Sequence, residues 1–283
     1  MTPARALAAA CAVLALANAS APAGAQSGAP DLDTPYVTTP DNVVRAMLDL
    51  AGVRAGERLL DLGSGDGRIV VAAARRGAVA HGVEIDPRLV AASRENARAA
   101  GLEARATFAA QDLFETDYAG TDVVTMYLLP DVNARLAPRL YATLRPGARI
   151  VSHDYGLGDW PADATIEVDA PGKTVGVAKR STLHRWTVPA KVGGGWSGGA
   201  GAEAVALELA QAWQSVSGTL RWRGRTLRIA ERRIEGTRVD LVADGGAGSV
   251  TLRLAAIGDG RLAGELLAAG EAPRRVELVR AAP

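Results

Sequence analysis

A glycine-rich loop with two carboxylates is the segment whose residue types and spacing could do chemistry. Gly63, Gly65 and Gly67 follow an apolar run typical of a buried strand, and a helical pattern follows them. Such a loop can hold the pyrophosphate of a dinucleotide at the N-terminus of the helix. Asp61 and Asp66 argue against that ligand, because two carboxylates would repel a pyrophosphate. They suit a ligand that carries an ammonium group and a positive sulfur.

Further acids stand where the neighbouring strands are expected to end. Glu84 closes the next expected strand, where a carboxylate can accept both hydroxyls of a ribose, although it could also cap the following helix. Asp112 follows the third strand and could accept from an adenine amino group or cap the next turn. We therefore predict an S-adenosylmethionine site. Its expected residues are Asp61, Gly63, Ser64, Gly65, Asp66, Gly67, Glu84, Ile85, Asp112 and Leu113.

Residues 36–188 resemble the class I S-adenosylmethionine-dependent methyltransferases, since several separated motifs agree with that superfamily in order and spacing. A narrower similarity is carried by the segments YVTTPDNVVRAML, LDLGSGDGRIVVAAARRGA, GVEIDPRLV, YLLP and PGARIVSHDYGLGDWPAD. They resemble the mitochondrial protein-lysine methyltransferases that act on the ATP synthase c-subunit and the adenine nucleotide translocase.

The resemblance implies a fold, a cofactor and an activity. The fold would be Rossmann-like, with a mainly parallel seven-stranded sheet and helices on both faces. The cofactor would be S-adenosyl-L-methionine, and the acceptor a lysine side chain of a protein. In the family a Tyr-x-x-Thr-Pro segment closes over the cofactor, which adds Tyr36 and Thr39 to the expected cofactor-binding residues.

The acceptor side is expected at the ends of the fourth and fifth strands. Tyr127 stands near the end of the fourth expected strand, within MYLLP, in place of the Asn/Asp-Pro-Pro-aromatic sequence of enzymes that methylate planar amides or adenine. That difference argues against those acceptors. We predict that Tyr127 lines the methyl-transfer pocket, with His153 and Asp154 at the end of the fifth strand as further catalytic candidates.

Strand and helix patterns alternate through the first part of the chain, which predicts parallel βαβ units. A helical pattern opens at Pro40 and Asp41 and stops at Gly52. Two shorter strands, 164–169 and 182–188, could complete the sheet as an edge hairpin. The other expected strands are 58–62, 80–85, 104–109, 122–128 and 148–153, and the other expected helices are 68–76, 88–100 and 133–144.

The composition changes after residue 188. Residues 189–202 are rich in glycine, which suits a linker. Beyond them short β-like runs alternate with turn residues, so residues 203–283 are expected to form a small antiparallel sheet or barrel. Its expected strands are 217–222, 226–229, 238–242, 249–254, 261–267 and 275–279.

The first 25 residues read as a secretory signal peptide. Arg5 precedes an apolar run over 6–17, and Ala-Gly-Ala at 23–25 fits a cleavage site. The run is shorter than the roughly 20 residues that span a bilayer. We therefore expect a periplasmic protein without a stable membrane span in its mature chain. An uncleaved N-terminus would instead tether it.

Composition restricts the partners. A formal net charge of +1 argues against nucleic acid, because phosphate binding needs an excess of Lys and Arg. The single cysteine lies at position 11, and the chain has only three histidines, so no metal is expected. The hypotheses are a protein-lysine methyltransferase, a small-molecule methyltransferase, or a catalytically inactive binding module that keeps the cofactor fold.

Overall fold

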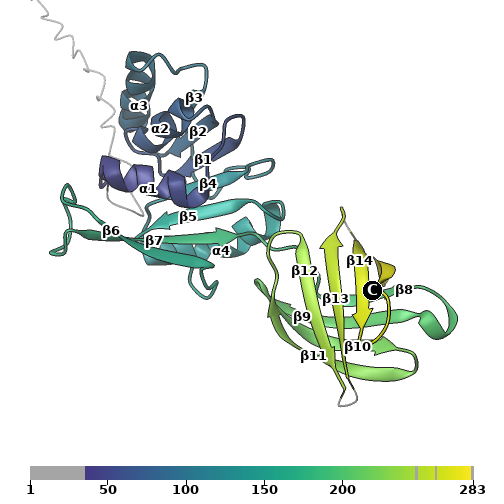
Figure 1. Ribbon diagram of the computed structural model, residues 1–283. Coiled ribbons are helices and arrows are strands. Elements are labelled where there is room, and N and C mark those ends of the chain that lie inside the picture. Colours follow the sequence, from purple (N-terminus) through teal and green to yellow (C-terminus); the bar gives the residue numbers. More distant parts are fainter. Residues whose placement is uncertain (1–35, 246–247, 259, 282–283) are drawn as a thin grey trace, which may run out of the picture. The chain divides into compact units, whose positions relative to one another are not determined.

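The computed structural model describes residues 36–245, 248–258 and 260–281. The predicted signal peptide, residues 1–25, lies outside the described residues. A mixed sheet with helices comes first in the chain and a closed antiparallel barrel follows it (Figure 1). We call them the α/β domain (residues 36–188) and the barrel (residues 194–280).

The sheet of the α/β domain has seven strands in the order β3-β2-β1-β4-β5-β7-β6. The first five are parallel, and β7 runs antiparallel to both β5 and β6. This confirms the predicted class I fold and the edge hairpin. The strands are β1 (Arg58–Leu62), β2 (Val79–Glu84), β3 (Ala106–Ala110), β4 (Val123–Met126), β5 (Arg149–His153), β6 (Ala164–Asp169) and β7 (Arg180–Thr187).

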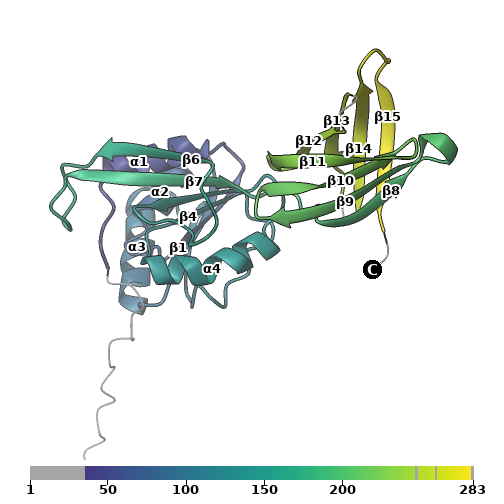
Figure 2. The same ribbon diagram turned by 90° about the horizontal axis from the view of Figure 1, so that it is seen from below.

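Apolar side chains on both faces of the sheet explain its position inside the domain. In β1, Leu59 packs into the core beneath three helices, whereas Leu60 and Leu62 point to the other face, because successive side chains of a strand alternate. The helices of the first face are α1 (Asp41–Ala51), α2 (Arg68–Arg75) and α3 (Pro87–Ala99). On the other face α4 (Pro130–Thr143) runs along the sheet (Figure 2).

Helix ends follow local signals in the sequence. Gly52 ends α1 in the left-handed conformation, and Asp86 caps α3 by accepting the backbone N–H of Arg88. The helix α4 begins at Pro130, three residues before the expected start, because proline is favoured in the first turn. Within the described ranges, no helix combines the length and the apolar character needed to cross a membrane.

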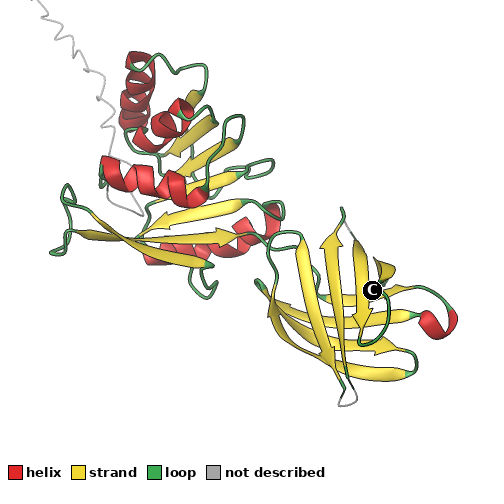
Figure 3. Ribbon diagram, viewed as in Figure 1, coloured by secondary structure: helices red, strands yellow, loops and turns green. Residues whose placement is uncertain are grey.

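The barrel closes eight strands in the order β10-β11-β12-β13-β14-β15-β8-β9, and Figure 3 shows that it is almost entirely strand. Its inward-facing apolar side chains, among them Trp196, Leu207 and Leu252, form one buried core. The strands are β8 (Gly194–Gly198), β9 (Val205–Ala212), β10 (Ser215–Trp222), β11 (Arg225–Arg233), β12 (Arg238–Asp244), β13 (Ser249–Ala256), β14 (Arg261–Ala268) and β15 (Arg274–Arg280).

Residues 189–202 were expected to be a linker before a β domain at 203–283, and the structure corrects the start of that domain. The expected linker contains β8, which pairs with both β9 and β15 and so closes the barrel. Glycine serves here as a strand residue, since a Cβ at Gly198 would lie 2.0 Å from the carbonyl oxygen of Glu277. Trp196 is buried and anchors the strand in the core. The β domain therefore begins before residue 203.

Candidate active site

The candidate site lies where the carboxyl ends of the parallel strands meet. The sheet order reverses between β1 and β4, and ligands of open α/β sheets bind in the crevice at such a switch point. A pocket at this edge is lined by residues that follow β1, β2, β3 and β4, together with the segment Tyr36–Thr39. The fold thus gathers five separated parts of the sequence around one cavity.

The glycine loop wraps closely around one end of the pocket. Gly63 and Gly65 both have a positive φ, which glycine adopts at little cost. A Cβ at Gly65 would lie 2.6 Å from the ring of Tyr36, so the loop leaves room for the aromatic side chain above it. Gly67 is the left-handed N-cap of α2, and a Cβ there would meet the ring of Phe108.

Glu84 ends β2 and has two roles. Its Oε2 accepts the backbone N–H of Gly65 at 3.0 Å, and its Oε1 accepts that of Asp86 at 3.0 Å. The carboxylate is almost fully buried and lines the pocket. Each carboxylate oxygen can accept more than one hydrogen bond, so Glu84 can hold the loop and still accept ribose hydroxyls.

Asp61 is a buried acid facing the same pocket. Burial raises the pKa of its carboxyl to about 7, aided by the charges of Glu84 and Asp66 and opposed by a hydrogen bond from Thr125. The hydroxyl of Thr125 donates to Asp61 Oδ1 over 2.7 Å. A positive ligand group beside Asp61 would restore its charge, so the pocket favours cations.

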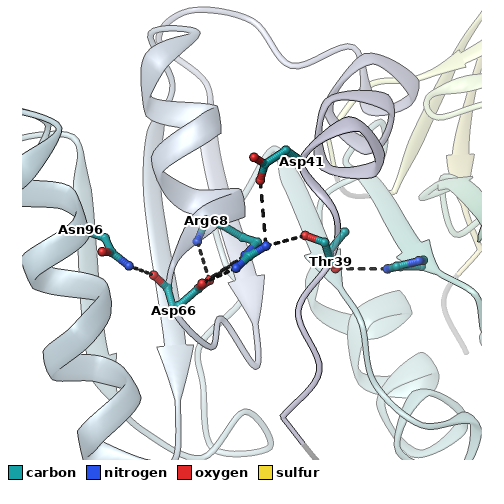
Figure 4. A network of polar contacts seen from close by, with 6 residues as sticks. Thr39, Asp41, Asp66, Arg68 and Asn96 are labelled. Carbon is teal, nitrogen blue, oxygen red and sulfur yellow. Dashed lines mark hydrogen bonds and ion pairs between the residues drawn. The ribbon is translucent and has the colours of Figure 1, made fainter. Parts of the chain in front are cut away.

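A strap formed by Tyr36–Thr39 borders the pocket and is tied down by Arg68. The guanidinium of Arg68 pairs with Asp66 at 2.6 Å and donates to the carbonyl oxygen of Thr39 at 2.9 Å (Figure 4). On the far side of the strap, Thr39 Oγ1 lies 3.1 Å from His153 Nδ1 in a hydrogen bond. Burial and the charge of Asp66 raise the pKa of the Tyr36 hydroxyl, which keeps it protonated.

Removing the Arg68 side chain should loosen this strap. We expect Arg68→Ala to weaken binding of S-adenosylhomocysteine by about 10-fold, since charge-assisted hydrogen bonds contribute about 1.5–3 kcal/mol each. Arg76→Ala is the matched control. Arg76 ties α1 through Asp49 and the carbonyl oxygen of Arg45, and it does not line the pocket. Equal affinity of both variants and the wild type in titration calorimetry would show that the strap does not contribute to binding.

Residues after β3 and at the end of β2 line the other end of the pocket. Asp112 is exposed, and its Oδ1 accepts the backbone N–H of Phe114 at 2.7 Å, so it caps the following turn. It also lines the pocket, as do Ile85 and Leu113. The cap uses Oδ1 of Asp112, and the binding of adenine by this residue stays a prediction.

Tyr127 and Asp154, both predicted to lie on the acceptor side, are hydrogen-bonded to each other. Tyr127 lines the pocket, and its hydroxyl donates to Asp154 Oδ2 over 3.1 Å. Burial, followed by the charge of Asp154, strongly raises the pKa of Tyr127. The phenol is therefore no base at neutral pH. Asp154 itself lies behind Tyr127 and does not line the pocket.

His153 was predicted as a catalytic candidate, but it lies buried outside the pocket. Its side chain is fully buried, and its ring packs under Tyr127 with the centroids 3.8 Å apart. Nδ1 is bonded to Thr39, and Nε2 lies 2.7 Å from Ser181 Oγ. Burial lowers the pKa of His153 to about 4, so the ring is neutral and supports Tyr127 without reaching the pocket. Its position at the end of β5 did not reveal this burial.

Twelve of the fifteen predicted site residues thus line one pocket. Gly67, His153 and Asp154 are the three that do not line it. Sequence reasoning missed Arg68, whose signal is a basic residue directly after an acidic glycine loop. It also missed apolar lining residues that carry no local signal: Ile69, Val83, Leu89, Phe114, Leu128 and Val132.

The side chains of this pocket fit S-adenosylmethionine. Four acids line it, Asp61, Asp66, Glu84 and Asp112, against the single guanidinium of Arg68. That balance suits a ligand with an ammonium and a sulfonium group. Ser64 Oγ is buried in the pocket wall, and within the described part of the chain no hydrogen-bond partner reaches it. It is therefore a polar atom that a ligand could satisfy.

Comparison with known proteins gives a family and several relatives. A family model described as the ANTKMT methyltransferase domain matches residues 61–164. A protein-lysine N-methyltransferase of Saccharolobus islandicus is 41% identical over 137 residues, which cover 48% of this chain and 85% of the archaeal protein. The adenine nucleotide translocase lysine N-methyltransferase of mouse is 38% identical, over 48% of this chain and 59% of that protein.

Two further relatives are a second mouse lysine methyltransferase and a solved structure with a bound cofactor product. The mouse lysine N-methyltransferase of the ATP synthase c-subunit is 35% identical over 46% of this chain and 53% of its own length. This chain thus spans little more than half of the mouse proteins it matches. A solved structure described as an RNA methyltransferase of Salinibacter ruber, with S-adenosyl-L-homocysteine bound, is 48% identical with a TM-score of 0.50. It covers 55% of this chain and 96% of its own.

Proposed function

We propose that this chain, which belongs to the ANTKMT family of S-adenosylmethionine-dependent protein-lysine methyltransferases, methylates lysine side chains of proteins in the cell envelope. S-adenosyl-L-methionine is its cofactor. The observation that supports the proposal is one continuous pocket. Acids line it at the cofactor side, and Tyr127 stands at the acceptor side.

The residues of this chain supply position, charge and exclusion of water. The bound cofactor supplies an activated methyl group on a positive sulfur. Methyl transfer forms a bond between the lysine nitrogen and the methyl carbon while the carbon–sulfur bond breaks, and the sulfur keeps the electron pair. The lysine must first lose a proton to solvent, and a partly dry pocket beside Tyr127 favours the neutral amine. Positioning can therefore supply most of the acceleration.

Shortening Tyr127 should slow the transfer without releasing the cofactor. We expect Tyr127→Ala to lower kcat about 10-fold, because the acceptor nitrogen loses the wall that orients it and water enters. The affinity for S-adenosylhomocysteine should stay within about 2-fold, since the cofactor side of the pocket is unchanged. Leu129→Ala, at an exposed side chain beyond Tyr127, is the control. A Tyr127→Ala enzyme with wild-type kcat would exclude this residue from the acceptor site.

The acceptor class can be identified with labelled cofactor. Purified protein is incubated with methyl-labelled S-adenosylmethionine and an envelope extract, and the label is followed into protein, RNA and low-mass fractions. Label in a discrete protein band that yields methyllysine on hydrolysis supports the proposal. Label in RNA would favour the acceptor class named for the Salinibacter relative. Label in the low-mass fraction would indicate a small-molecule methyltransferase, and binding without transfer a cofactor-fold binding module.

The envelope location rests on the sequence of the first 25 residues. Cell fractionation combined with N-terminal sequencing tests it, and a mature chain that begins near Gln26 in the periplasmic fraction is expected. Membrane-bound protein with an intact N-terminus would indicate a tether. Protein of full length in the cytoplasm would contradict the location and leave the lysine specificity to the labelling experiment.

A further inference from the structure

A lysine of the chain itself is paired with the carboxylate that holds the Tyr127 hydroxyl. Lys173 follows β6 in the turn that leads to β7, and its Nζ lies 2.7 Å from Asp154 Oδ2. Both side chains are mostly buried, with 12% and 14% of their surface exposed. The same Asp154 oxygen accepts the hydroxyl of Tyr127, the residue expected to border the acceptor nitrogen. A lysine ammonium and the Tyr127 hydroxyl therefore share one carboxylate oxygen.

The backbone holds the Asp154 carboxylate in a fixed direction. Asp154 adopts φ +63°, which is uncommon for a residue other than glycine, and its Oδ1 accepts the backbone N–H of Thr182 at 3.1 Å. Oδ2 is thereby left to face Tyr127 and Lys173. A non-glycine residue held in this region costs free energy, and such residues cluster at functional sites.

A carboxylate at this position is useful to methyl transfer onto an amine. The attacking amine is neutral, and positive charge moves from the sulfur to the nitrogen as the new bond forms. A nearby carboxylate therefore interacts more strongly with the transition state than with the neutral amine. Neutral His153, which lies 3.6 Å from Asp154 Oδ2, does not compensate the carboxylate. Lys173 is its cationic partner among the ion pairs of the described residues.

We propose that Asp154 binds the nitrogen of the acceptor lysine, and that Lys173 occupies this carboxylate until an acceptor lysine displaces it. The inference rests on the proposed lysine specificity. Because Asp154 lies behind Tyr127 and its carboxylate is held by the backbone, the Tyr127 side chain would turn aside to let the acceptor nitrogen reach Oδ2 from the pocket. The exposed ring of Tyr155 lies beside Tyr127, with the ring centroids 6.5 Å apart.

A purely structural role for Lys173 makes the opposite prediction. Lys173 Nζ also donates to the carbonyl oxygen of Arg180 at 2.8 Å, so it could simply staple the turn between β6 and β7. In that case its removal would loosen the site and raise KM for the acceptor. If Lys173 competes with the acceptor, its removal must lower KM.

The test compares steady-state kinetics on a lysine peptide for full-length wild type, Lys173→Ala and Lys179→Ala. Lys179 lies on the same turn and donates to the carbonyl oxygen of Lys173 without touching Asp154, so its variant controls for loosening. We expect Lys173→Ala to lower KM for the peptide about 5-fold, because the partly buried Asp154 carboxylate is then free to pair with the acceptor lysine. The control should not lower it. An unchanged or raised KM in Lys173→Ala would overturn the proposal.

Asp154→Asn provides the second arm. Asparagine keeps the shape of the side chain and tolerates a positive φ, so the fold should be retained. We expect kcat to fall about 10-fold, since the developing charge loses its partner. Adding Lys173→Ala to Asp154→Asn should give no further decrease in KM, because the competitor acts only through the carboxylate. Additive effects of the two substitutions on KM would contradict the shared position.

A binding measurement separates this inference from the proposed function. n-Butylammonium serves as a probe of the site in the presence of S-adenosylhomocysteine and is titrated into the wild type and Lys173→Ala by NMR. Tighter binding to the variant supports the Asp154 site even if no lysine peptide is methylated. Turnover of lysine peptides without any difference in probe affinity or KM would reject the Asp154 site and leave the proposed function standing.

Discussion

Glu84→Ala should reduce the affinity for S-adenosylhomocysteine at least ~10²-fold. The expected loss combines two contributions. Hydrogen bonds to a charged partner contribute about 1.5–3 kcal/mol each, and the carboxylate is expected to accept two ribose hydroxyls. The substitution also frees the backbone N–H groups of Gly65 and Asp86, so the glycine loop loses its anchor. Titration calorimetry measures the affinity.

Two companion variants separate these contributions. Glu84→Gln keeps an oxygen acceptor of the same shape and should retain more affinity than Glu84→Ala. Glu95→Ala, on the exposed face of α3, should bind like the wild type, because Glu95 pairs with Arg98 at the surface and does not line the pocket. If Glu84→Ala bound the ligand tightly, the ribose assignment would be wrong. A cooperative thermal transition of each variant shows that the fold is retained.

Asp61→Asn should weaken cofactor binding about 10²-fold while stabilising the cofactor-free protein above pH 7. Burial raises the pKa of Asp61 to about 7 in the folded chain, well above the value of about 3.9 in an unfolded one. Between these values the folded state binds more protons than the unfolded state, so the free energy of unfolding falls as pH rises from about 4 to 7. Asparagine carries no charge and removes that loss.

The two effects of Asp61→Asn are measured separately. Thermal melts of the cofactor-free proteins at pH 5 and pH 8 should show the larger gain for the variant at pH 8. Calorimetry of S-adenosylmethionine at pH 6, in buffers of different ionisation enthalpy, should show proton release for the wild type and none for the variant. At pH 6 the free Asp61 carboxyl is mostly protonated. The ammonium of the ligand favours its ionised form, so Asp61 releases its proton when the ligand binds. Proton release by both proteins would assign it to another group.

Much of the α/β domain could be predicted because local signals determine it. The strand β1 and the end of α1 at Gly52 have the residues expected from the sequence. Apart from Tyr36 and Thr39, the expected cofactor residues are sequence-local too, since they lie at or shortly after the end of a parallel strand. Once the strands are parallel, their carboxyl ends must meet, and Asp61, Glu84 and Asp112 come together without further information.

The closure of the barrel and the roles at the acceptor side needed long-range contacts. The strand β8 consists largely of glycine, and only its neighbours β9 and β15 make it a strand. His153 and Asp154 are neighbours in the sequence, and nothing in the sequence distinguishes their roles. Burial made His153 a neutral support of Tyr127, whereas Asp154 adopts the left-handed conformation and accepts the hydroxyl of Tyr127.

The sequence by itself therefore determined the fold class, the cofactor and the glycine loop, because strand periodicity and the acids after each strand are local properties of the chain. Only the tertiary structure decided that Arg68 ties the strap, that His153 is buried and that Lys173 binds Asp154. Such contacts join residues far apart in sequence, and their partners are selected by packing. A motif of neighbouring residues does not encode them.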